Sequence, residues 1–140
     1  MESAVSTFRV SLVSPEKLLF TGQVDQVDLP GVEGGFGVLA GHAPIVAMLR
    51  PGIVTAIAGS VRDGFVVFGG LAEFSKEELT ILAESATPVD ELDLAGLKAQ
   101  IEAMQESLTK KPVGDELDRA IALLDHYKSI HTSLAATTAF

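Results

Sequence analysis

The sequence predicts a β + α protein in two successive parts. An antiparallel β-sandwich or barrel is expected over residues 1–88, followed by an antiparallel two-helix hairpin over residues 89–140. In the first part, apolar residues alternate with polar ones, and turn residues interrupt the pattern at roughly eight- to twelve-residue intervals, as in antiparallel strands. After Thr87-Pro88 the apolar spacing becomes three and four, which is the period of a helix face.

The strands of the first part are marked by alternating apolar residues, expected to face a common core: Phe8, Val10 and Leu12; Val27 and Leu29; Phe65 and Val67; Leu79, Ile81 and Ala83. Two turns are predicted between them. Arg50-Pro51-Gly52 fits a turn with proline at its first central position. Asp63-Gly64 fits a tight hairpin, because glycine accepts the positive φ of a type I′ turn.

The segment from Gly34 to Pro44 is predicted to be a shaped loop between two strands. It contains four glycines, a histidine and a proline. Glycine permits positive φ and close backbone approach, and proline prevents the segment from continuing as a central strand. Such a loop could bind phosphate, hold a metal ion or present a surface to a partner.

The second part is predicted to be two helices of similar length. Asp90 or Asp93 can cap the first helix, and a break is expected from Lys111 to Gly114. The chain from about residue 133 is expected to fray. The apolar stripe of the first helix is Leu94, Leu97, Ile101, Met104 and Leu108, and that of the second is Leu117, Ile121, Leu124 and Tyr127 or Lys128.

Composition excludes several classes of function. The net charge is −9 with ten Lys and Arg residues, which argues against a nucleic-acid partner. Without cysteine there are no disulfides or thiolate metal sites. The N-terminus shows no secretory signal, and the longest apolar stretch, Ala43 to Leu49, is too short to span a bilayer. We therefore expect a cytoplasmic protein with no direct membrane insertion.

The chemistry of the glycine-rich loop points away from catalysis. A P-loop needs a Lys-Ser/Thr pair that opens a helix, whereas Gly41 is followed by His42, Ala43 and Pro44. The β part holds no second histidine to complete a metal site. We interpret His42 as a brace that bonds a nearby carbonyl, and we expect no cofactor, metal or catalytic residue. The residues alone indicate an interaction module.

Several ordered motifs nevertheless resemble one family. Glu33-Gly34-Gly35-Phe36-Gly37, Gly41-His42-Ala43-Pro44 and Pro51-Gly52 are similar to the signature of epsilon subunits of bacterial F-type ATP synthases. Phe68 to Phe74 resembles that family's second signature, and Val13 to Glu16 and Thr80 to Ala86 match in order and spacing. The resemblance covers residues 6 to about 133.

The resemblance implies a non-catalytic rotor subunit in the central stalk, which couples the catalytic head to the proton-translocating membrane ring. The β part would be a flattened sandwich that docks on the gamma subunit and on the polar loops of the c-subunit ring. Glu33 to Phe36 would face the ring, and Gly41 to Pro44 would shape the adjacent turn. The hairpin would regulate ATP hydrolysis through the alpha and beta subunits. The protein would be peripheral, at the cytoplasmic face of the inner membrane.

Two departures from the family pattern weaken the regulatory part. ATP-sensing members carry Ile/Leu-Asp-x-x-Arg-Ala, and this chain keeps Leu92 and Asp93 but has Gly96 in place of the arginine. ATP binding is therefore not expected. The second helix offers Arg119 and Lys128 as basic contacts among four acidic residues, so the hairpin is expected to be a weak brake.

Two alternatives from other classes stay open on the sequence alone. One is a free-standing adaptor that binds another partner through the hairpin. The other is an enzyme whose active site is the His42 loop, which predicts that His42→Ala abolishes turnover in a folded protein.

Overall fold

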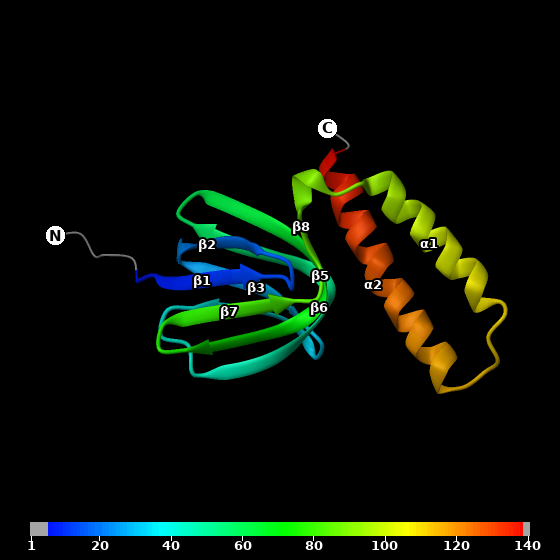
Figure 1. Cartoon of the computed structure of the whole chain (residues 1–140), viewed down its shortest axis with the longest axis horizontal. Coiled ribbons are helices and arrows are strands. Elements are labelled where there is room, and N and C mark those ends of the chain that lie inside the picture. The colour runs from blue at the N-terminus through cyan, green and yellow to red at the C-terminus, as the bar shows by residue number, and fades with distance from the viewer. Residues whose placement is uncertain (1–5, 139–140) are drawn as a thin grey trace. The chain divides into compact units, whose positions relative to one another are not determined.

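In the computed structural model, which describes residues 6–138, the chain divides into two units with their boundary between Pro88 and Val89 (Figure 1). The second unit contains a short 3-10 turn (Val89–Glu91), α1 (Leu94–Leu108) and α2 (Asp115–Thr138). Strands followed by a helical pair confirm the predicted β + α class. The first unit contains β1 (Phe8–Val13), β2 (Leu18–Val24), β3 (Gln26–Gly31), β4 (Gly34–Leu39), β5 (Ile45–Ala58), β6 (Val61–Ser75), β7 (Glu78–Ala83) and β8 (Ala86–Pro88).

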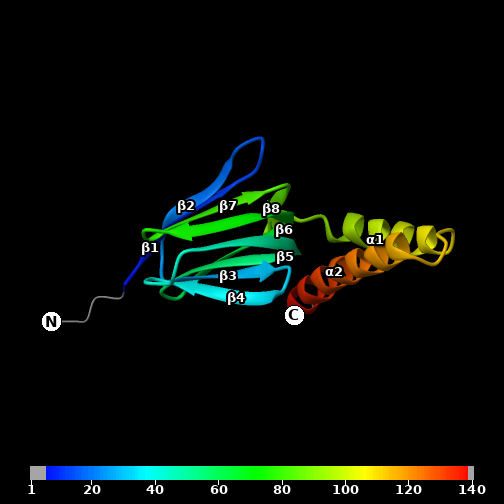
Figure 2. The same ribbon diagram turned by 90° about the horizontal axis from the view of Figure 1, so that it is seen from below.

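The strands form two layers that share the long strands β5 and β6 (Figure 2). In the first layer, β2, β1 and β7 continue into the C-terminal half of β6 and the N-terminal half of β5. In the second layer, β8 and β3 flank the other halves of these long strands, and β4 pairs with β3. The apolar residues predicted to face the core are buried, as their alternation requires.

In both long strands, the alternation of inward- and outward-facing residues shifts by one residue at the same place. The register passes from Leu49 opposite Gly70 to Pro51 opposite Phe68, so one residue of each strand is skipped in the pairing. Each strand thereby sends side chains into one core from both layers. The buried residues are Leu49, then Val54 and Ala56, in β5, and Phe65 and Val67, then Ala72 and Phe74, in β6.

Backbone chemistry explains why the bend lies there. Gly69 and Gly70 have φ of 102° and 147°, values that side-chain-bearing residues rarely adopt. A Cβ on Gly70 would lie 2.4 Å from the carbonyl oxygen of Leu82.

The predicted turn at Arg50-Pro51-Gly52 is wrong. Pro51 lies within β5, at an irregularity in the strand pairing where a missing N–H is tolerated.

The predicted hairpin at Asp63-Gly64 is also wrong. The β5–β6 turn is Gly59-Ser60, and Gly64 pairs with Thr55 inside the ladder. Gly59 supplies the positive φ, 62°, that a two-residue turn requires. Its N–H also donates to Oδ2 of Asp25 at 2.6 Å, which ties the turn to the β2–β3 corner. A tertiary hydrogen bond that the local sequence does not reveal thus supports the turn.

Two further expectations for the β part need correction. The pair β1–β7 is parallel, unlike the antiparallel pairs predicted throughout, because strands distant in sequence need no hairpin between them. The glycine-rich segment is not a loop along its whole length. Gly34 to Leu39 form strand β4, which pairs with β3, and the loop is confined to residues 40–44.

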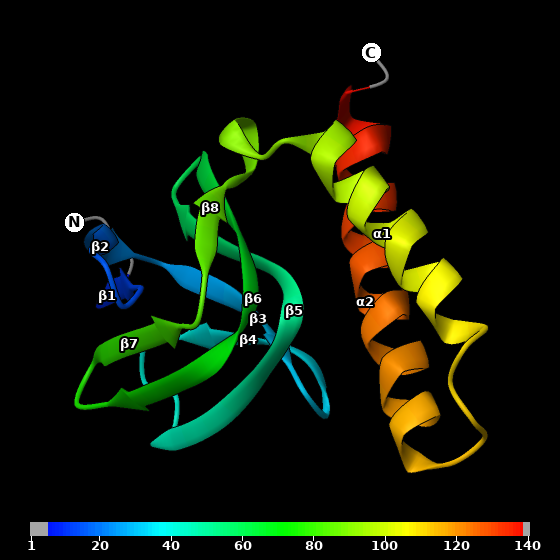
Figure 3. The ribbon, with the colours of Figure 1, turned by 45° about the vertical axis from the view of Figure 1, so that its right-hand side comes forward.

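Figure 3 shows α1 and α2 side by side and antiparallel. Burial follows the predicted stripe in α1 and departs from it in α2. Leu97 and Ile101 of α1 are buried, as expected. In α2, Leu124 and Ile130 are buried, whereas Ile121 is exposed and does not belong to the apolar side. The helix continues to Thr138, so the prediction that the chain frays from about residue 133 is wrong for residues 133–138. Ala139 and Phe140 lie outside the described residues.

Replacing Gly70 tests the bend. We expect Gly70→Ala to lower the free energy of unfolding by about 3 kcal/mol, because it adds φ strain and a clash with the Leu82 carbonyl. Gly34→Ala is the matched control, since Gly34 has φ of 130° with no atom within 4 Å of the added Cβ. It should cost about 1 kcal/mol in urea unfolding. Equal losses in the two variants would contradict the steric argument.

Candidate docking surface

The outer face of the first layer carries a continuous apolar row. Met48 of β5 lies opposite Leu71 of β6, and Leu71 lies opposite Leu82 of β7. The row continues through Val13 of β1 to Leu18 of β2. Paired residues point to the same side of a sheet, so these five side chains form one stripe across five strands. We call this stripe the outer row.

The outer row is exposed, although its side chains are of the apolar types usually found in a core. Met48 exposes 63% of its surface, Leu18 56% and Leu82 51%. Their sequence neighbours Leu49, Ala72 and Ile81 fill the core. A sheet with one wet face is expected to alternate apolar and polar residues. Along the outer row this layer is apolar on both faces, which makes the outer face a candidate docking surface.

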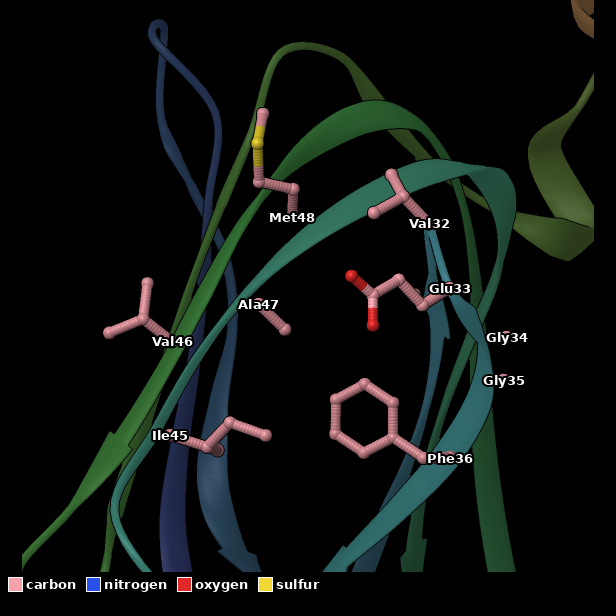
Figure 4. A pocket seen from close by; sticks show the side chains of 10 residues that line it. Val32, Glu33, Gly34, Gly35, Phe36, Ile45, Val46, Ala47 and Met48 are labelled. Atoms are coloured by element: carbon pink, nitrogen blue, oxygen red, sulfur yellow. The ribbon is translucent and has the colours of Figure 1, made fainter.

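A hollow of about 560 Å³ adjoins the row, between the β3–β4 turn and the start of β5 (Figure 4). Ile45 and Ala47 of β5 and Phe36 of β4 point into it, and the Glu33 carboxylate lies at its side. Val32 lies near Met48, and its N–H donates to the Met48 carbonyl at 2.9 Å. The hollow and the outer row therefore meet along β5.

Hydrogen bonds within the adjoining loop and to the β6–β7 turn hold residues 40–44. Gly41 has φ of 83°, and its N–H donates to Oε1 of Glu77 in the β6–β7 turn at 2.9 Å. The His42 ring donates from Nδ1 to the Ala43 carbonyl at 2.7 Å. The ring also stands edge-on to Phe74, with centroids 6.0 Å apart. These contacts are the ones expected of a histidine that braces the loop.

The structure separates the predicted surface residues into three sets. Glu33, Gly34, Gly35 and Phe36 line the hollow. Gly37 instead lies under a hydrogen bond from Gln26 Nε2 to Asp28 Oδ1, and a Cβ there would lie 3.0 Å from that oxygen. Gly37 is thus required by packing within the β3–β4 pair. Gly41, His42, Ala43 and Pro44 form the braced loop beside β5.

In the helical unit, the Asp93 side chain caps the N-terminus of α1. Its Oδ1 accepts the N–H of Gly96 at 3.0 Å. A Cβ on Gly96 would lie 2.5 Å from the other carboxylate oxygen, so Gly96 permits this close cap. Leu92 is half-buried beside it, and Arg119 and Lys128 are exposed on α2.

Sequence reasoning missed the residues that dominate the surface: Val32, Val46, Met48, Leu71, Leu82 and Leu18. A signal was present in the runs around Met48, Leu71 and Leu82, where apolar residues occupy both phases of a strand. The sequence does not show where the phase shifts within β5 and β6, and so it leaves the outward residues unidentified.

Metal sites and membrane-spanning helices are the two other kinds of feature considered for residues 6–138. No group of three or more histidine or acidic side chains is placed to hold a metal ion within that range. Neither described helix combines the length and apolarity needed to cross a membrane.

Comparison with known proteins gives consistent results. A family model described as the beta-sandwich domain of the ATP synthase delta/epsilon chain matches residues 7–89. The chain is 71% identical to ATP synthase epsilon chain 2 of Nitrobacter hamburgensis, over 97% of this chain and 100% of that protein. It is 60% identical to the ATP synthase epsilon chain of Rhodopseudomonas palustris (strain BisB18), over 95% and 98% of the two chains.

Two solved structures share the fold at low sequence identity. A chain of the Euglena gracilis mitochondrial ATP synthase, solved as OSCP/F1/c-ring, aligns with a TM-score of 0.77 at 23% identity, covering 96% of this chain and 86% of that one. A chain of the Tetrahymena thermophila mitochondrial ATP synthase central stalk and c-ring aligns at 0.61 and 14% identity, covering 98% and 100%. At these identities the likeness shows the fold.

Removing the Glu77 carboxylate tests the bracing of the loop. We expect Glu77→Ala to lower the free energy of unfolding by about 1 kcal/mol and to speed hydrogen exchange at the Gly41 amide. Glu77→Gln keeps an acceptor oxygen and should retain most of the protection. Unchanged exchange at Gly41 in Glu77→Ala would show that this bond does not hold the loop.

Proposed function

This chain belongs to the family of ATP synthase epsilon chains, and from that membership we propose that it is a non-catalytic rotor subunit of the central stalk. In this role it couples the catalytic head to the membrane ring. The outer row is the observation that carries the proposal, because an exposed apolar stripe on a folded sheet is suited to permanent burial against a partner.

The β unit supplies two adjoining surfaces for such an assembly. We assign the outer row to the gamma subunit. A broad apolar stripe that a partner covers along its whole length resists slipping when torque is transmitted. The hollow with Glu33, Gly35 and Phe36 is assigned to the polar loops of the c-ring, where glycines allow close approach and Glu33 offers a charge.

The proposed location in the cell follows from the proposed partners, the gamma subunit and the c-ring. The chain would be held at the cytoplasmic face of the inner membrane through the complex. The ring of His42 is engaged by a main-chain carbonyl and by Phe74, an arrangement that supports bracing rather than turnover.

The hairpin is proposed to act as a weak brake on ATP hydrolysis, in contact with the alpha and beta subunits. Its capping carboxylate, Asp93, is already bonded to Gly96, and that position has no guanidinium to bind a phosphate. Arg119 and Lys128 are the basic groups assigned to contacts with the alpha and beta subunits. Nucleotide-controlled latching is therefore not expected of this hairpin.

Charged substitutions in the outer row test the docking proposal. Met48→Lys and Leu71→Lys should each weaken co-purification of gamma with the tagged chain by at least about tenfold, because each buries an ammonium in an apolar contact. The matched control is Val61→Lys, which alters a residue 57% exposed at the start of β6, outside the outer row. The wild type truncated after Pro88 should still retain gamma. Normal gamma binding by both row variants would overturn the assignment.

Deleting residues 89–140 tests the brake. ATP hydrolysis by the complex assembled with the truncated chain should rise by less than about fivefold, the lower range of allosteric coupling. The comparison uses complexes of equal subunit composition and equal ATP synthesis capacity. A much larger rise would show that the hairpin is a strong inhibitor.

A further inference from the structure

The methionine of the outer row is open to solvent in the free chain. Met48 exposes 63% of its surface, and its side chain extends from β5 beside the hollow (Figure 4). Met104 of α1, the other methionine of residues 6–138, is half-buried, and Met1 lies outside the described residues. A thioether reacts with an oxidant in solution more readily when solvent reaches the sulfur. Of these two described methionines, Met48 is therefore the better placed to be oxidised.

Three hydrocarbon side chains lie around Met48 on the outer face. Leu71 lies opposite it on β6, and Val46 lies two residues earlier on the same face of β5. Val32 lies beside it in the β3–β4 turn, where its main-chain N–H is already bonded to the Met48 carbonyl. None of these three side chains carries a hydrogen-bonding group. An oxygen placed on the Met48 sulfur finds no partner among them and depends on water for its hydrogen bonds.

We propose that Met48 is a reversible oxidation site that controls docking, an inference that rests on the proposed docking of the outer row to the gamma subunit. The oxidant is a hydroperoxide. A lone pair of the sulfur attacks one peroxide oxygen, the O–O bond breaks and an S–O bond forms. The sulfur loses two electrons and becomes a sulfoxide, while hydrogen peroxide is reduced, its proton passing to the departing oxygen, which leaves as water.

The sulfoxide opposes docking because it makes an apolar position polar. Its oxygen accepts hydrogen bonds, and covering it with an apolar partner removes the water that supplies them. The partner that covers the outer row also covers the sulfur, so oxidation takes place before assembly and is prevented by it. A chain oxidised at Met48 is thus kept out of the complex until reduction of the sulfoxide restores the thioether.

Oxidation by itself is measured on the free full-length chain treated with hydrogen peroxide. Peptide mass spectrometry should show the sulfoxide of Met48 forming several times faster than that of Met104, because Met48 is the more exposed. Equal rates, or faster oxidation of Met104, would overturn the assignment of the site. No partner takes part in this measurement, so its result is independent of the proposed rotor function.

Docking is measured as capture of gamma by the tagged full-length chain, which is treated with peroxide and freed of it before gamma is added. Treated wild type should capture at least about tenfold less gamma than untreated wild type. Methionine sulfoxide reductases A and B, one for each sulfoxide epimer, should restore capture. Each variant is compared with its own untreated sample. Met104→Leu should lose capture on treatment as the wild type does, whereas Met48→Leu should keep its starting value.

Three results would overturn the proposal. One is undiminished capture by a chain whose Met48 is fully oxidised, and another is an equal loss of capture in Met48→Leu and the wild type. The third is a clearly lower urea midpoint in the treated chain, which would place the damage in the fold. Failure of the rotor function looks different, because untreated wild type would then capture no gamma. That result would remove the control of docking, while the oxidation rates still decide the site.

Discussion

The shared bend of β5 and β6 is the constraint on which the β unit depends. Both strands shift phase by one residue where Leu49 faces Gly70, so each contributes to two layers around one core. The shift is possible because Gly70 has no side chain to meet the Leu82 carbonyl and adopts a φ that other residues avoid. A side chain there would strain the backbone and clash with the Leu82 carbonyl.

The same bend determines the surface. It turns Leu49 and Ala72 inward, which leaves their neighbours Met48 and Leu71 on the outside, paired across the sheet. Because β7 and β1 continue this layer, the apolar row extends beyond the two bent strands. The hollow forms where the start of β5 leaves the β3–β4 turn. The core and the candidate docking surface are thus two faces of one layer.

Much of the fold could be predicted because alternation and helix period are local signals, as the buried Phe8, Val10 and Leu97 demonstrate. The turns at Pro51 and Gly64 were wrong because a local turn signal competes with ladder pairing, which only the tertiary structure reveals. The docking residues named from the sequence stay a prediction. Motifs led to Glu33 and Phe36, but the outward direction of Met48 depends on a phase shift that no short pattern encodes.

The most direct test of the central claim is thiol labelling, because the chain has no native cysteine. Leu71→Cys and Met48→Cys report on the outer row, and Val61→Cys reports on exposed surface elsewhere on β6. In the free chain all three should react rapidly with a maleimide. In the assembled ATP synthase, labelling at positions 71 and 48 should be suppressed while position 61 stays reactive. Equal labelling of positions 48 and 71 in the free and assembled states would contradict the claim that a partner covers the outer row.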